Sequence, residues 1–259
     1  MSSSEAQKRQ AVETHSQQAD QFARSYVHLS EEHYQNCFAY SRHRLEALLA
    51  RYLPAQGGGR RLLDVGCGTG HHLASLRARG FEVAGVDGSE AMLEHARRNN
   101  PGVDLRQCDV ERLPHPDAQF DLVLCVEVLR YLPHMDACLR EIARVLRPGG
   151  VALVTAAPRF NLNGFWPVNR LATLVPGLKL TPLRQYFTTS AGLRRALRAA
   201  GFAEATIHGV YLGPLNWVER LAPRALPRLL RAWEPRDAAL ADQPLLRDFS
   251  NMFLAVGTR

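Results

Sequence analysis

LLDVGCGTG at residues 62–70 joins a short apolar run to a glycine-rich turn, and a helical stretch follows it. Glycine lets the backbone turn sharply and lets a ligand come within contact distance of the main chain, which a Cβ atom would prevent. A strand that runs through such a turn into a helix predicts a site for a nucleotide-like ligand, although the turn alone does not identify the ligand.

Short β-type runs alternate with helical stretches along the rest of the core. Strands are predicted at 61–65, 81–86, 103–108, 120–126 and 151–155, with helices near 71–79, 89–99 and 135–146. Parallel neighbours in a sheet need a connection of roughly a dozen residues or more, which a helix supplies. The predicted fold class is therefore α/β, with a Rossmann-like, doubly wound sheet that is mostly parallel. An antiparallel last strand is expected within 249–256, together with N-terminal helices and helical cap insertions.

The chain divides where its composition changes. Apolar residues recur at helical spacings over 17–53, and Pro54 and a run of three glycines then break the pattern. Two later connections are long enough to carry structure or function of their own. The predicted boundaries are 1–56 for an N-terminal helical extension and 57–259 for the ligand-binding domain, with cap insertions at 157–189 and 214–247.

Composition and charge limit the class of protein. The 259 residues are 46% hydrophobic and 22% charged, which is typical of a globular chain. Neither a membrane-spanning run nor a secretory signal pattern is found, so a cytoplasmic location is expected. Five scattered cysteines without a CxxC pair favour reduced thiols over a zinc site.

The net charge of +7 is concentrated in the C-terminal part, because residues 157–259 carry 14 Lys and Arg against 6 Asp and Glu. A solvated face explains this equally well as contact with an anionic acceptor, a membrane surface or an acidic carrier protein. Arginines also interleave with tryptophan and leucine over 215–233, which fits an amphipathic lid, a peripheral membrane contact or ordinary packing on the core.

Two features of the glycine turn decide between ligands. The dinucleotide fingerprint needs glycines at relative positions 1, 3 and 6, but here they fall at 66, 68 and 70, and the Walker Lys-Ser/Thr pair is absent. Asp64 stands at the strand end, where a carboxylate repels a pyrophosphate but attracts a cation. This pattern favours S-adenosylmethionine (SAM) over NAD or a nucleoside triphosphate.

Acidic residues follow the next two strands as well. Asp87 ends the second strand, where a carboxylate can accept hydrogen bonds from both hydroxyls of a ribose, and a helix N-cap is the alternative role. Asp109 follows the third strand, where it is suited to an adenine amino group, and a turn role is nearly as well supported.

Five ordered segments resemble the class I SAM-dependent methyltransferase family, particularly its small-molecule members. They are LLDVGCGTG, VDGSEAML, QCDVERLP, FDLVLCVEVLRYLP and RPGG, and they cover about residues 60–156. The resemblance implies that Asp64, Gly66 and Gly68 surround the methionine part of SAM and that Asp87 binds the ribose. It also implies that Asp109 and Val110 flank the adenine, with Val126 and Glu127 at the methyl-transfer end. The remaining predicted cofactor-binding residues are Cys67, Gly88 and Met92.

Methyl transfer from a sulfonium needs mainly that donor and acceptor be held together, and a base is needed only where the acceptor must lose a proton. The candidate catalytic residues are Glu127, Tyr131 and His134, with solvation as the alternative for His134 and packing for Tyr131; His208 and Tyr211 lie in an expected sixth strand. No metal is predicted, because Arg130-Tyr131 replaces the Glu-His pair found in the similar ubiquinone-biosynthesis O-methyltransferases.

The acceptor is expected to be a small molecule, apolar or anionic in part. Aromatic side chains of the first cap could line its pocket or form the cap's own core: Phe160, Phe165, Trp166, Tyr186 and Phe187, with Arg159 or Arg184 at the mouth. No nucleic-acid partner is expected, since the Asn/Asp-Pro-Pro-Tyr/Phe motif of amino-methylating enzymes is missing. The prediction is O- or N-methylation of a secondary or lipid-like metabolite. A non-catalytic SAM-binding protein and an RNA-modifying enzyme remain the alternatives.

Overall fold

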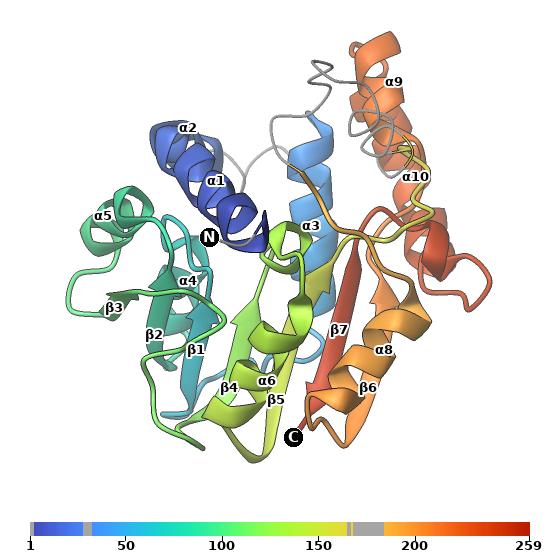
Figure 1. The fold of residues 1–259 in the computed structure, drawn as a ribbon. Coiled ribbons are helices and arrows are strands. Elements are labelled where there is room, and N and C mark those ends of the chain that lie inside the picture. Colours follow the sequence, from blue (N-terminus) through green and yellow to red (C-terminus); the bar gives the residue numbers. More distant parts are fainter. Residues whose placement is uncertain (1–2, 28–32, 165–166, 168–183) are drawn as a thin grey trace.

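A seven-stranded sheet in the order β3-β2-β1-β4-β5-β7-β6 runs through the computed structural model (Figure 1). The structure describes residues 3–27, 33–164, 167 and 184–259. The strands are β1 (Arg61–Val65), β2 (Glu82–Asp87), β3 (Asp104–Gln107), β4 (Phe120–Cys125), β5 (Leu146–Ala156), β6 (Glu204–Gly209) and β7 (Phe253–Thr258). The first five are parallel, and β7 pairs antiparallel with both β5 and β6. The predicted Rossmann-like, mostly parallel sheet with an antiparallel last strand is confirmed.

Helices follow β1, β2, β4 and β5, and the spacing predicted the first three of them but not the fourth. They are α4 (His71–Ala78), α5 (Glu90–Asn99), α6 (Met135–Val145) and α8 (Ser190–Ala199), with short 3-10 helices at η1 (Leu129–Tyr131) and η2 (Arg247–Phe249). The helix starts follow capping chemistry, because the hydroxyls of Ser89 and Thr189 accept hydrogen bonds from Met92 N and Gly192 N. The last apolar run begins as η2, so the final strand starts at Phe253.

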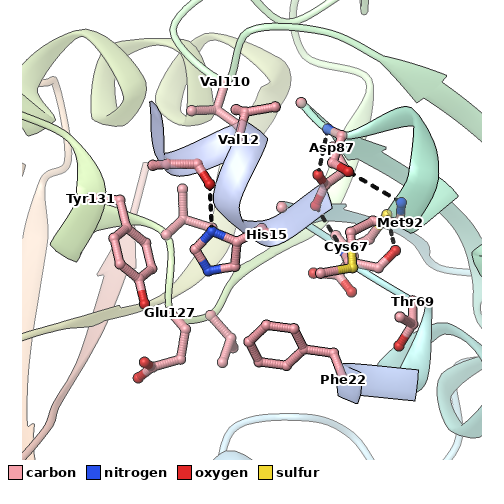
Figure 2. A pocket seen from close by; sticks show the side chains of 18 of the residues that line it. Val12, His15, Phe22, Cys67, Thr69, Asp87, Met92, Val110, Glu127 and Tyr131 are labelled. Carbon is pink, nitrogen blue, oxygen red and sulfur yellow. Dashed lines mark hydrogen bonds between the residues drawn. The ribbon is translucent and has the colours of Figure 1, made fainter. Parts of the chain in front are cut away.

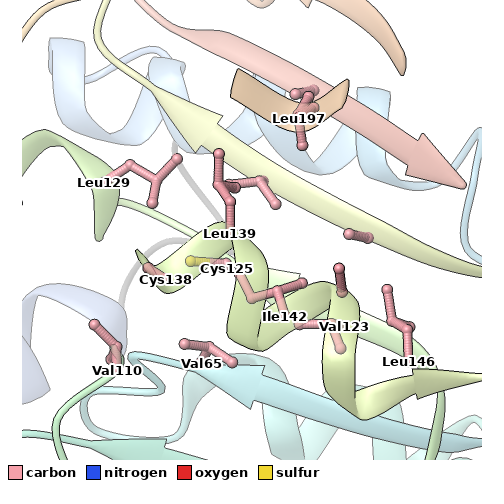
Figure 3. Packing of buried hydrophobic residues seen from close by; sticks show 14 of the residues in the cluster. Val65, Val110, Val123, Cys125, Leu129, Cys138, Leu139, Ile142, Leu146 and Leu197 are labelled. Atoms are coloured by element: carbon pink, nitrogen blue, oxygen red, sulfur yellow. The ribbon is translucent and has the colours of Figure 1, made fainter. Parts of the chain in front are cut away.

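Both faces of the sheet are buried, because successive residues of a strand point to opposite sides. Leu63 and Val65 of β1 face α6 and α8 in one apolar cluster, part of which Figure 3 shows. Leu62 faces the other way, into a cluster with α3 (Cys37–Leu49) and α10 (Leu226–Leu240). Asp64 is on the same side of β1 as Leu62, and it pairs with β2 on one flank and β4 on the other. A carboxylate is thereby placed in the middle of the sheet.

The chain begins with two helices, α1 (Ser3–Gln17) and α2 (Ala19–Val27), which lie near α5 (Figure 1). The helical pattern was predicted only from residue 17, so α1 was missed. The sequence of α1 is polar. Its buried apolar residue Ala11 does not by itself make the periodic apolar pattern by which a helix is recognised. Polar contacts hold α1 instead: the Ser16 hydroxyl lies 2.7 Å from the Ser89 hydroxyl of the α5 cap.

Two helices lie between β6 and β7. They are α9 (Leu215–Leu221) and α10, and the segment between them contains Pro223. A buried hydrogen bond of 2.5 Å from Tyr40 to Asp237 anchors α10 on α3, and Asp237 also accepts from Leu212 N at 2.6 Å. Among the described residues, no helix has both the length and the apolar character that crossing a bilayer requires.

Candidate active site

A cavity of about 850 Å³ opens where β1, β2 and β4 end, and α1 covers it (Figure 2). Every predicted cofactor-binding residue lines this cavity, and so do two of the candidate catalytic residues. The lining residues that the sequence singled out are Asp64, Gly66, Cys67, Gly68, Asp87, Gly88, Met92, Asp109, Val110, Val126, Glu127 and Tyr131.

Other predicted residues lie elsewhere. His134 is exposed at the N-cap of α6 and is not among the cavity-lining residues, because the chain leaves the cavity after Leu132. His208 is buried away from the cavity between Tyr52 and Asp242. The aromatic wall predicted for the first cap is not found among the described residues: Phe160 is half-exposed, and neither it nor Tyr186 or Phe187 lines the cavity. Phe165 and Trp166 lie outside the described residues.

Asp64 is an almost fully buried carboxylate in the cavity wall. Burial raises its pKa to about 6, although the charge of His72 opposes the rise. Its Oδ2 atom has no hydrogen-bond partner within the described part of the chain. An ionised carboxylate in this position is costly by itself, so a cationic ligand group in the cavity would stabilise it.

The glycine turn brings the backbone against the cavity. Gly66 has φ +75°, and a Cβ atom there would lie 2.2 Å from Cγ2 of Val128. The amides of Gly66 and Cys67 both donate to the carbonyl of Val86 on the neighbouring strand, at 2.8 and 3.0 Å. The turn is therefore fixed, and only glycine fits at its first position.

Asp87 ties this turn to the next helix. Its Oδ2 accepts from Gly68 N at 2.9 Å and its Oδ1 accepts from Ser89 N at 2.8 Å. Burial raises the pKa of Asp87, while these two amide hydrogen bonds oppose the rise. Each carboxylate oxygen can accept a further hydrogen bond, so two hydroxyl groups of a ligand can be bound here. Ser89 is the N-cap of α5, which leaves Asp87 available for that role.

Asp109 makes the turn contact that was one of its two predicted roles, and its adenine role stays a prediction. Its Oδ1 accepts from the amide of Glu111 at 2.9 Å, which is a turn contact, and its Oδ2 lies 2.9 Å from the ammonium of Lys8 on α1. Val110 beside it is buried and gives the cavity an apolar surface at this end.

Glu127 follows β4 with φ +63°, an uncommon conformation for a residue other than glycine. Its amide donates to the Thr155 hydroxyl at 2.7 Å, and its carboxylate is paired with Arg130. Burial alone would raise the pKa of Glu127, but the charge and hydrogen bond of Arg130 hold it below its usual range. Glu127 is thus an ionised, paired group and a weak candidate for a base.

Several cavity-lining residues were not predicted from the sequence. They come from helices that precede the glycine turn or begin at its end: Lys8, His15, Phe22, Phe38, Arg42, His71 and His72. Phe22, Phe38 and Arg42 lie in the helical stretch predicted at 17–53, and His71 and His72 lie in the helix predicted near 71–79. None of these residues belongs to a recognised site motif, and the place of those on α1 and α3 depends on how these helices fold back over the sheet.

One group of these residues offers metal-ligand atoms. Glu46, His71 and His72 have ligand atoms within 4.8 Å of one another, and His72 Nδ1 lies 3.2 Å from Glu46 Oε1. Burial, and to a smaller extent the charge of His72, lowers the pKa of His71 to about 4. The guanidinium of Arg42 also acts on both Glu46 and His71, which disfavours a further cation at this end of the cavity.

A family model described as a methyltransferase domain matches residues 63–154. The ubiquinone biosynthesis O-methyltransferase of Aeromonas salmonicida is 34% identical over 167 residues, covering 61% of this chain and 69% of the relative. The fatty-acid O-methyltransferase of Mycolicibacterium smegmatis is 35% identical over 181 residues, covering 68% and 58%. A structure of a SAM-dependent methyltransferase from Thermotoga maritima, a possible histamine N-methyltransferase, has the same fold, with a TM-score of 0.59 and 19% identity over 94% of this chain and 97% of that one.

The chain therefore belongs to the SAM-dependent methyltransferase family, and SAM is its cofactor. The cavity fits this cofactor, because the unpartnered oxygen of Asp64 suits a cationic amino group and Asp87 can bind a diol. The chain spans 48 to 66% of the length of several other curated relatives, so their acceptors cannot simply be transferred to it.

Proposed function

We propose that this protein is an enzyme that transfers a methyl group from SAM to an oxygen or nitrogen atom of a small acceptor. The observation that carries the proposal is the buried carboxylate of Asp64, which has an unpartnered oxygen and belongs to the wall of the cavity that the glycine turn and α1 share. Bound SAM supplies an electrophilic methyl group on a sulfonium. The protein's own residues bind SAM and the acceptor, orient them and enclose them.

Each part of SAM has its own proposed set of cavity residues. Asp64 holds the amino group of the methionine part, and Arg42 and His72, which both act electrostatically on Asp64, hold its carboxylate. Asp87 accepts from the ribose hydroxyls, and Met92 and Val110 pack against the adenine. Gly66 and Gly68 let the cofactor lie against the main chain. These roles rest on the contacts described above and on the family resemblance.

The acceptor end of the cavity supports a partly apolar acceptor. Phe22, Val128 and Leu132 give the cavity wall an apolar surface. Relatives named as acting in ubiquinone biosynthesis, on fatty acids and on malonyl-[acyl-carrier protein] are all O-methyltransferases. An oxygen acceptor on a lipid-like or acidic molecule is therefore the acceptor class that we favour.

A peripheral membrane contact is part of the proposal. Trp217, Leu221 and Leu229 of α9 and α10 are exposed, and arginines that are also exposed stand among them, namely Arg220, Arg224 and Arg228. Sedimentation with vesicles of phosphatidylcholine and phosphatidylglycerol should retain the protein, and Leu221→Glu should weaken retention. The cytoplasmic location stays a prediction.

The test uses methyl-labelled SAM with 3,4-dihydroxybenzoate, oleate and histamine as probes of three acceptor classes. We expect labelled product from one of the oxygen acceptors with the wild-type protein, and almost none with Asp87→Ala. SAM binding without transfer to any probe, or to small molecules of a cell extract, would instead support a non-catalytic SAM-binding protein. RNA as the labelled product would support the RNA-modifying alternative.

A further inference from the structure

We propose that His15, on the N-terminal helix α1, is the proton acceptor for the group that is methylated. This inference rests on the proposed methyl transfer and adds a catalytic residue to it. The side chain lies in the cavity between Tyr131, Glu127 and Phe22, as Figure 2 shows.

The ring of His15 is held in one orientation. Its Nδ1 atom lies 2.7 Å from the carbonyl oxygen of Ala11, one turn earlier in α1. A carbonyl only accepts, so Nδ1 carries the hydrogen of the neutral ring and Nε2 keeps its lone pair. Nε2 is therefore the nitrogen able to take a proton from a bound molecule.

Aromatic neighbours fix the ring from two sides. Phe22 of α2 stacks on it with ring centroids 5.6 Å apart and an interplanar angle of 18°. Tyr131 of η1 meets it edge-on, with centroids 4.8 Å apart. Phe22 lies on the helix that follows α1, whereas Tyr131 is distant in sequence, so the imidazole is positioned by the packing of α1 over the sheet. A preoriented base is effective, since proton transfer requires hydrogen-bond reach.

Acidic groups at the ends of two strands lie close to His15. The positive charge of a protonated His15 acts on the carboxylates of Glu127, after β4, and Asp87, at the end of β2. Glu127 is paired with Arg130, which keeps that carboxylate ionised but also reduces its net charge. The phenol of Tyr131 is the remaining titratable group in contact with the ring.

Other candidate bases are less well placed among the described residues. Glu127 is already paired, and His134 does not line the cavity. His72 lies 3.2 Å from Glu46 and acts on Asp64, at the end where the methionine part of SAM is proposed to bind. His15 is therefore the imidazole that the structure places next to Glu127 and Tyr131.

The proposed step balances as follows. A lone pair of the acceptor oxygen forms the bond to the methyl carbon, and the bond from that carbon to sulfur breaks with its electron pair going to sulfur, which becomes neutral. The proton of the acceptor hydroxyl moves to Nε2 of His15. The imidazolium then loses this proton to water after the product leaves.

The first test compares two acceptors with methyl-labelled SAM from pH 5.5 to 9. The phenol of 3,4-dihydroxybenzoate must lose a proton, whereas the carboxylate of oleate is already ionised. His15→Gln keeps an amide that can donate to Ala11 but has no basic nitrogen. We expect it to lower kcat for the phenol about 100-fold, as removal of a general base does, and to abolish the acidic limb of the pH profile. The loss of kcat in His15→Gln should become smaller as the pH approaches the pKa of the phenol.

For oleate, His15→Gln should change kcat less than about twofold, because no proton has to be removed. Glu13→Gln, an exposed position on the same helix, is the matched control and should leave both acceptors unaffected. An equal loss for both acceptors would show that His15 only positions α1, and no loss for the phenol would overturn the proposal. Methylation of oleate alone would also contradict it.

The second test does not depend on turnover. Long-range proton–nitrogen NMR correlations of the imidazole rings, with His15→Gln to identify the signal, should show at pH 8 that Nδ1 carries the hydrogen and Nε2 does not. A ring protonated on Nε2 would overturn the proposal even if the enzyme is active. If the wild type methylates neither probe, the acceptor prediction has failed and this measurement alone decides the role of His15.

Discussion

The ammonium of Lys8 lies 2.9 Å from the carboxylate of Asp109, joining the first helix of the chain to the loop after β3. A second carboxylate, that of Glu111, lies 2.6 Å from the same ammonium. Lys8 is mostly buried by these contacts, so α1 closes over the cavity through an ion pair at one end and the rings around His15 at the other.

Replacing Lys8 should loosen this closure. Partly exposed ion pairs contribute about 0.2–1 kcal/mol each, so Lys8→Met should speed amide hydrogen exchange in α1 by about threefold to tenfold. Glu13→Gln on the exposed side of α1 should change nothing. Exchange at the wild-type rate in Lys8→Met would mean that the ion pairs do not hold the helix.

The glycine turn should not tolerate a methyl group. Gly66→Ala places a Cβ atom 2.2 Å from Cγ2 of Val128 and requires alanine to adopt φ +75°. We expect SAM affinity to fall at least about tenfold, because relief of the clash moves the turn away from its position, a backbone effect of roughly 1–3 kcal/mol. Gly149→Ala, also at positive φ but with open space around it, is the control for the conformational effect alone. Equal affinity of Gly66→Ala and wild type would contradict the proposed approach of the cofactor.

The hydrogen bond from Tyr40 to Asp237 should matter for stability and little for SAM binding. Tyr40→Phe leaves a fully buried carboxylate without one of its donors, which costs about 1–3 kcal/mol. Urea unfolding should therefore show a lower midpoint with an unchanged slope. Leu221→Ala, on the exposed surface of α9, should leave the midpoint unaltered. An unchanged midpoint for Tyr40→Phe would show that Leu212 N and Arg44 satisfy Asp237 without the phenol.

Asp64 should make the SAM-free protein less stable as the pH rises. Its pKa is raised to about 6 by burial, so between the ordinary value of 3.8 and about 6 the folded state binds more protons than the unfolded state. The free energy of unfolding therefore falls with rising pH across that window. We expect Asp64→Asn to be more stable than wild type by about 1–3 kcal/mol at pH 7 and nearly equal to it at pH 4. A mutant less stable than wild type at pH 7 would contradict the buried-charge assignment.

Local sequence signals predicted the sheet because most of its strands and crossover helices have a recognisable apolar pattern of their own. The run at 61–65 is β1, and the helices at 71–79 and 135–146 differ from α4 and α6 by one residue at the C-terminal end. The predicted cofactor-binding residues come to line one cavity for the same reason, since most of them follow strand ends. His15 and Lys8 could not be found this way. Their role depends on a polar helix folding back onto residues some 70 to 115 positions away, which no local pattern encodes.

His134 shows the opposite limit. Its type and its place after β4 suggested a base, but the 3-10 turn at Leu129–Tyr131 directs Tyr131 into the cavity and leaves His134 outside. Tyr131 and His134 are only three residues apart, and the packing of Leu129 and Leu132 in the core decides which of them lies in the cavity. Sequence spacing alone does not determine this choice.

Calorimetric titration of SAM into wild type, Asp64→Asn and Asp104→Asn between pH 5 and 7 tests the central claim most directly. Asp104 is an exposed carboxylate paired with Arg106 outside the cavity, so its variant is the matched control. We expect the affinity of the wild type for SAM to weaken about tenfold per pH unit below about 6, with proton release on binding. Asp64→Asn should bind at least about tenfold more weakly at pH 7 and show no such proton release, while Asp104→Asn should match wild type. Equal SAM affinity in Asp64→Asn and wild type, with the same pH dependence, would contradict the account.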